Sequence, residues 1–170
     1  SHKLVGPFAA IAKTSPVAIS TLTTKAKRKA ANYIAFEGAI PTYKELILMR
    51  ALALLKGIEG LNPCFVMDEY TKGELESTER TPGSGRMIVE NGTVAGIPIF
   101  TTNYINDDTN TYVGFGYWGY EPLQGFGQQR FIIDPYTGAT SDSVRLTLNA
   151  DWSMTTLRPE AFVLGKCASE

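Results

Sequence analysis

The glycines at positions 114, 116 and 119 have the GxGxxG spacing of dinucleotide-binding loops. In those loops the glycines let the first turn of a helix approach a pyrophosphate. Here the segment continues into Glu121-Pro122 and a further pair of glycines, so no helix is expected to begin there. A second glycine-rich segment, residues 82–86, lacks the Lys-Ser/Thr ending of a P-loop. We therefore predict no bound cofactor, and a surface loop at residues 82–86.

Carboxylates could supply acid–base chemistry or bind a metal, and six of them lie in close pairs. The pairs are Asp68/Glu69, Glu74/Glu76 and Asp107/Asp108. Acids this close in sequence usually complement a helix start or lie in a solvated loop. Residues 106–110 also lack the central glycine and distal glutamate of a calcium loop. The pairs predict neither a catalytic dyad nor a metal site.

Histidine and cysteine chemistry is equally limited. The one histidine is His2, which removes the mechanisms that need an internal imidazole. Cys64 and Cys167 have neither CxxC spacing nor a neighbouring histidine, so two ordinary thiols are predicted. These observations favour a protein that is not an enzyme.

Composition bounds the remaining possibilities. The 170 residues are 44% hydrophobic and 19% charged, enough for one compact domain or a domain with a small lobe. A net charge of -1 argues against a dedicated nucleic-acid binder. A basic cluster at Lys25, Lys27, Arg28 and Lys29 leaves two interpretations open: contact with nucleic acid, or a solvated helix face. No apolar run approaches the length of a membrane span, and no membrane partner is predicted. The start Ser1-His2-Lys3 resembles no signal peptide and suggests a fragment or processed product.

Helix signals dominate the first half of the chain. Residues 25–36 read as an amphipathic helix ended by Gly38, and residues 41–56 as a helix with the capping-box pair Thr42 and Glu45. The second helix is apolar around most of its surface, so other elements should cover it. A strand at residues 64–67 and a helix begun by Asp68 follow.

Strand signals dominate the second half. Asn91-Gly92 predicts a tight hairpin turn, and Pro98 confines its strand to a sheet edge or a strand start. Residues 112–120 read as an aromatic, glycine-rich strand. Residues 131–133 and 144–148 read as a hairpin around a turn at 135–138, with one buried face. The distribution predicts an α+β fold.

Four phrases, in this order, are similar to those of one family. They are Asn-Pro-Cys-Phe-Val-Met at 62–67, Ser-Gly-Arg at 84–86, Gly-Ile-Pro-Ile at 96–99 and Arg-Pro-Glu-Ala-Phe-Val-Leu-Gly at 158–165. Together they resemble the major capsid proteins of tailed bacteriophages with the Hong Kong 97-type fold. The resemblance implies a central sheet flanked by helices with an extended β-hairpin lobe. The family's N-terminal arm, extended loop and spine helix are not recognisable before residue 41.

The resemblance also implies a layout and a role. Residues 41–127 would form the axial domain, 128–150 the peripheral-domain strands, and 151–170 the return to the axial domain, while 1–40 stay unassigned. Glu79, Arg80 and Arg86 would be candidates for ion pairs between subunits. The intact protein would form pentamers and hexamers of an icosahedral shell, located in the virion and assembled in the bacterial cytoplasm. Its partners would be packaged DNA, through non-specific contact only, and a scaffolding protein, a maturation protease and a portal.

Two alternatives stay open. An encapsulin-like nanocompartment subunit would share the fold but enclose protein cargo. A small ligand- or glycan-binding domain could use the aromatic residues Tyr112, Tyr117, Trp118 and Tyr120, although such rings in strands more often belong to a core.

Overall fold

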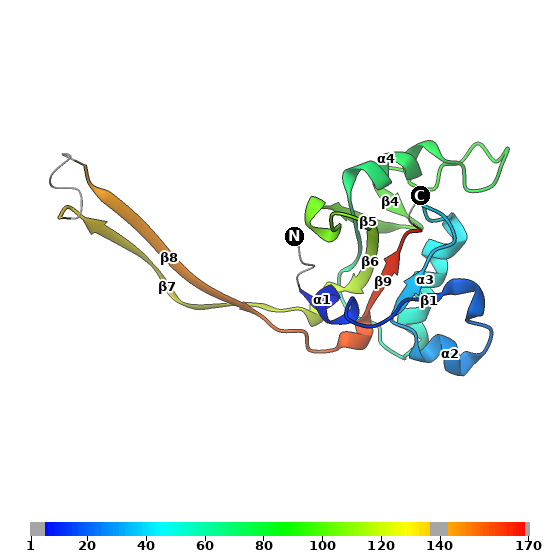
Figure 1. Ribbon diagram of the computed structural model, residues 1–170, viewed down its shortest axis with the longest axis horizontal. Coiled ribbons are helices and arrows are strands. Elements are labelled where there is room, and N and C mark those ends of the chain that lie inside the picture. Colours follow the sequence, from blue (N-terminus) through cyan, green and yellow to red (C-terminus); the bar gives the residue numbers. More distant parts are fainter. Residues whose placement is uncertain (1–5, 137–142, 169–170) are drawn as a thin grey trace. The chain divides into compact units, whose positions relative to one another are not determined.

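The computed structural model describes residues 6–136 and 143–168, which fall into two units (Figure 1). The first unit runs up to residue 121 and resumes at 156, and the second spans residues 122–155. The first holds a mixed sheet with helices, and the second is a two-stranded ribbon. The α+β class and the hairpin lobe predicted from the sequence are confirmed.

Seven strands form the sheet of the first unit, in the order β1-β2-β9-β6-β3-β5-β4. Their bounds are β1 Val17–Ala18, β2 Tyr33–Ala35, β3 Pro63–Met67, β4 Thr93–Val94, β5 Ile97–Thr101, β6 Tyr112–Tyr117 and β9 Phe162–Lys166. β2 and β9 are parallel, while β6 is antiparallel to both β9 and β3. The last strand in chain order therefore lies inside the sheet.

Four α-helices accompany this sheet in the described part of the chain. They are α1 Pro7–Ile11, α2 Lys25–Ala30, α3 Tyr43–Leu55 and α4 Glu69–Ser77, with short 3-10 turns η1 Ile19–Thr21, η2 Asn103–Ile105, η3 Trp118–Tyr120 and η4 Pro159–Ala161. α3 begins as predicted. The Thr42 hydroxyl accepts a hydrogen bond from the Glu45 backbone at 3.3 Å, and the Glu45 carboxylate accepts one from the Thr42 backbone at 2.8 Å.

Only one side of α3 is fully covered, so the prediction that other elements cover the whole of its apolar surface is wrong. Its buried face packs toward β6 and β9 and consists of Leu46, Met49, Leu52 and Ala53. Leu48, Leu54 and Leu55 stay about 40% exposed. The apolar helix surface is wider than the sheet and loops that pack against it.

The GxGxxG segment forms part of the core. Gly114 and Gly116 lie on β6, where an added Cβ would overlap the rings of Phe8 and Phe162 respectively. Each glycine thus makes room for an aromatic ring on one face of the sheet. We expected no helix to begin in this segment. A single 3-10 turn, η3, does begin at Trp118 and ends at Tyr120.

Two further boundaries differ from the sequence expectations. The helix predicted for residues 25–36 ends at Ala30, and Tyr33–Ala35 forms β2 instead. β2 is held by parallel pairing with Leu164, Gly165 and Lys166 of β9. The Asn91-Gly92 turn is confirmed: both residues have positive φ, at 53° and 70°, between the bridged residues Glu90 and Thr93.

The second unit consists of β7 Leu123–Asp134 and β8 Arg145–Met154, paired antiparallel. A bulge between Phe126 and Arg130 interrupts the register, and Gly127 in it has φ 78°. The hairpin is confirmed, and residues 137 and 138 of its predicted turn lie outside the described residues. The prediction that one face is buried is wrong for the single chain, since nearly every described residue of both strands is exposed.

Candidate interaction surfaces

One face of the ribbon carries apolar side chains that the chain itself does not cover. Phe131 is paired with Leu148 and Ile133 with Leu146, so all four project from the same face. Each is 60% to 62% exposed. Paired apolar residues of this kind normally lie in the core of a sheet protein.

The apolar face extends along the whole of β8. Every second residue from Leu146 to Met154 shares it, and Trp152 and Met154 are 58% and 51% exposed. The Trp152 ring covers Gly125 of β7, and Leu123 is paired with Met154. We call this surface the apolar ribbon face; it comprises Leu123, Phe131, Ile133, Leu146, Leu148, Trp152 and Met154.

The opposite face of β8 is polar throughout. It presents Arg145, Thr147, Asn149, Asp151 and Ser153. On β7 this face also carries Phe126 and Ile132, which are paired with Asp151 and Thr147. The strict alternation along β8 is the pattern of a strand that is buried on one side.

A two-stranded ribbon of this kind is marginally stable in water by itself. Its exposed apolar surface and unpaired strand edges favour association with other protein surfaces. The single chain therefore exposes a continuous apolar surface along one face of the ribbon.

The loop after α4 holds the three charged residues singled out from the sequence. The carboxylate of Glu79 accepts hydrogen bonds from the backbone of Gly83 at 2.7 Å and of Gly85 at 3.2 Å. Arg80 donates to the Met87 carbonyl at 2.9 Å, and its guanidinium lies 4.7 Å from the centre of the Tyr43 ring. Glu79 thus shapes the loop, and Arg80 fastens it to the start of α3.

Arg80 and Arg86 converge on Glu90, which the sequence reasoning missed. Arg86 makes two hydrogen bonds to the Glu90 carboxylate, at 3.3 and 3.1 Å, and Arg80 lies 3.5 Å from it. The hydrogen bonds and charge of Arg86 hold the pKa of Glu90 below its ordinary value. The available signal was the four-residue spacing of Arg86 and Glu90. Arg80 reaches the same carboxylate because the chain reverses in the loop between Glu79 and Met87, which form an antiparallel bridge.

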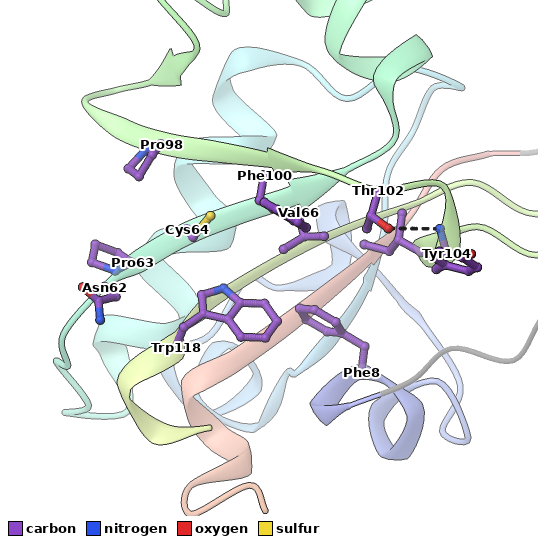
Figure 2. Close-up of a pocket in the computed structure, with 11 residues that line it drawn as sticks. Phe8, Asn62, Pro63, Cys64, Val66, Pro98, Phe100, Thr102, Tyr104 and Trp118 are labelled. Carbon is purple, nitrogen blue, oxygen red and sulfur yellow. Dashed lines mark hydrogen bonds between the residues drawn. The ribbon is translucent and has the colours of Figure 1, made fainter. Parts of the chain in front are cut away.

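A groove of about 610 Å³ lies on the sheet face beside α1 (Figure 2). Cys64, Val66, Phe100 and Trp118 line it, together with Phe8, whose ring packs edge-on to Trp118 at 5.9 Å. Its lining is mostly apolar, and burial raises the pKa of the Cys64 thiol. The lining contains no carboxylate, histidine, lysine or arginine, and a thiol with a raised pKa is a poor nucleophile.

The aromatic residues considered for ligand binding do not form one surface. Tyr112 and Tyr117 are 6% and 5% exposed and belong to the core. Tyr112 donates a hydrogen bond to Asp107 at 3.1 Å, and Tyr120 donates one to the Glu59 carbonyl at 3.1 Å. Trp118 alone of the four lines the groove. A stacking platform made of all four rings is therefore not present.

One carboxylate of each predicted pair contributes to local structure. Glu69 and Glu76 lie within 4 Å of Lys72 on α4. Asp107 accepts hydrogen bonds from the Thr109 and Asn110 backbones. Among the described residues no group of three or more His, Cys, Asp or Glu side chains could hold a metal ion, and no helix is both long and apolar enough to cross a bilayer.

Comparison with known proteins identifies the fold. No family model and no curated protein matches the sequence. Among solved structures, the capsid of an empty GTA particle matches 82% of this chain with a TM-score of 0.56 and 19% identity. The fold is that of phage capsid proteins. A Gordonia phage Cozz structure matches 89% with a TM-score of 0.56 and 16% identity. A virus-like particle from Pyrococcus furiosus matches 84% with a TM-score of 0.56 and 13% identity.

This capsid fold was the one expected from the four sequence phrases, and the expectation is confirmed. The chain spans only 50%, 54% and 59% of the lengths of those three structures. The match therefore concerns only the fold of the part of those proteins that this chain covers.

Proposed function

We propose that this chain is part of the major capsid protein of a tailed phage or prophage. In the intact protein it assembles into pentamers and hexamers of an icosahedral shell that encloses DNA. Its role is structural rather than catalytic. Scaffolding protein, a maturation protease and the portal are the other partners that this role implies.

The observation that carries the proposal is the apolar ribbon face on a capsid fold. A shell protein must bury surface against several neighbouring copies, and this uses repeated complementary patches rather than reactive groups. The ribbon supplies such a patch, with seven large apolar side chains on one side. We assign the ribbon to the peripheral domain and the sheet unit to the axial domain.

The loop at residues 78–90 is a second contact in this proposal. Glu79, Arg80 and Arg86 lie near the axis of a capsomer and face the same loop of adjacent subunits. Because the Arg86 side chain is 65% exposed, its pairing with Glu90 can be exchanged for a neighbour's carboxylate. Exposed pairs of this kind fix the register of subunits more than they add strength.

Electron microscopy and light scattering of the purified protein over a range of concentrations test this proposal. We expect rings or closed shells whose formation depends on concentration. A protein that stays monomeric at every concentration, with the ribbon folded, would contradict it.

A cellular nanocompartment shell is the second candidate, favoured by the likeness to the Pyrococcus furiosus virus-like particle. The contents of assembled particles separate the two. Nuclease-protected DNA inside them supports the phage capsid, and a co-purifying protein without nucleic acid supports the nanocompartment.

A further inference from the structure

A basic groove lies between α2 and the turn before β9. The groove has a volume of about 370 Å³ and is lined by Lys29 of α2, Lys56 after α3, and Arg158, with Asn32 beside them. Glu160 is the one carboxylate in its lining. Lys25 lies one helical turn before Lys29 and therefore extends the same side of α2.

These cations have no carboxylate partner within ion-pair distance among the described residues. The ion pairs found there all involve Lys72, Arg80 or Arg86. Arg28, by contrast, turns its guanidinium back to the carbonyls of Leu22 and Thr23, at 2.8 and 3.2 Å. The cluster is positive although the whole chain carries a net charge of -1.

We propose that this basic groove, defined by Lys25, Lys29, Lys56 and Arg158, binds the phosphate backbone of nucleic acid without reading its sequence. The inference rests on the proposed function, and it names the surface through which the shell protein contacts the DNA it encloses. Lysines and arginines spaced along a groove neutralise successive phosphates and release counterions. Among the described residues that line the groove, Glu160 is the one carboxylate that competes with a phosphate for these charges.

Lys56 gives the groove a distinctive response to pH. Burial lowers the pKa of Lys56 to about 8, although the charge of Glu160 opposes this, and its ammonium donates to the Ala31 carbonyl at 3.0 Å. Lys29, Arg158 and Glu160 are the other charged groups that line the groove. A bound phosphate favours the protonated amine, so binding takes up a proton above pH 8.

The first test measures fluorescence anisotropy of a labelled DNA duplex of arbitrary sequence as sodium chloride is raised. The variant Lys25→Gln/Lys29→Gln/Arg158→Gln should bind about tenfold more weakly at low salt, and its slope of log affinity against log salt should fall by about 2 to 3. The control, Lys13→Gln/Lys44→Gln/Lys72→Gln, removes the same charge elsewhere and should keep the slope.

Equal losses in the two triple variants, or no binding by the unaltered protein at low salt, would overturn the inference. Circular dichroism establishes that each variant is folded. If the groove variant does not fold, the single changes Lys29→Gln and Arg158→Gln replace it, each with an expected slope change of about 1.

The second test follows the affinity from pH 7 to pH 9.5. The unaltered protein should lose affinity severalfold as Lys56 deprotonates, whereas Lys56→Arg should not, because arginine keeps its charge. A pH dependence that persists unchanged in Lys56→Arg would exclude Lys56 from the site.

Electron microscopy of the same variants separates this inference from the proposed function. If a groove variant forms shells and binds DNA as well as the unaltered protein, the proposed DNA-binding role of the groove is refuted and the capsid role is not. DNA binding through the groove by a protein that never assembles refutes the capsid role alone.

Discussion

Replacing Leu146 and Leu148 with serine probes the apolar ribbon face directly. The two side chains are 60% and 62% exposed in the single chain, so most of their surface is free to be buried against a neighbour. Complete burial of a leucine is worth about 1.5–3 kcal/mol, so the exposed part of each contributes about 1–2 kcal/mol. We expect the double variant to associate roughly 30- to 700-fold more weakly, because each 1.4 kcal/mol changes an equilibrium constant tenfold.

Sedimentation velocity over a range of protein concentrations measures this effect, and circular dichroism reports whether the fold is retained. The matched control is Thr147→Ala/Asn149→Ala, which alters the polar face of the same strand. Association of the leucine variant at the same concentrations as the unaltered protein would refute the reasoning. Equal weakening in both double variants would show that the strand, and not its apolar face, drives assembly.

Three further predictions concern the sheet unit and are checked by denaturant unfolding. Gly116→Ala should destabilise the fold by about 1–3 kcal/mol, because the added Cβ would overlap the Phe162 ring. In the control Gly73→Ala, on α4, the added Cβ meets nothing within 4 Å, so this variant should be more stable by about 0.5–1 kcal/mol. Equal changes in the stability of the two variants would contradict this reasoning. Leu52→Ala should cost about 2–5 kcal/mol, since the side chain is 3% exposed in the core, and a loss below 1 kcal/mol would refute that burial. Burial alone would raise the pKa of Asp107, but hydrogen bonds from Asn110, Thr109 and Tyr112 outweigh it and lower the pKa to about 2. The ionised Asp107 should therefore stabilise the fold above about pH 4, and this contribution should be lost as the pH falls through 2. The difference in unfolding free energy between the unaltered protein and Asp107→Asn should shrink between about pH 4 and pH 2.

Local signals in the sequence were reliable wherever neighbouring residues decide the structure. The capping box at Thr42 and Glu45 forms both of its hydrogen bonds, and Asn91-Gly92 adopts the positive φ values of a tight hairpin turn. Both are set within a few residues, so composition and spacing predict them.

Long-range pairing explains what the sequence did not predict. β2 was assigned to a helix because its pairing partners on β9 lie about 130 residues away, as Tyr33 and Leu164 illustrate. Likewise, Arg80 meets Glu90 only because the loop between them brings Glu79 opposite Met87, whereas Arg86 and Glu90 are four residues apart. The similarity of the four phrases gave the fold, whereas the residues alone gave only its class.

The ribbon shows a limit of a different kind. Alternation along β8 correctly indicated an amphipathic strand, yet its apolar face is exposed in the single chain. A periodic pattern records that a surface is to be covered, but not by which molecule.

The interior position of β9 has a consequence for synthesis. β9 bridges β2 and β6 and follows the ribbon in chain order. On the ribosome, the two halves of the sheet stay unjoined until translation has passed Phe162–Lys166. Chains interrupted before Phe162 lack the strand that joins β2 to β6, so the sheet cannot close in them.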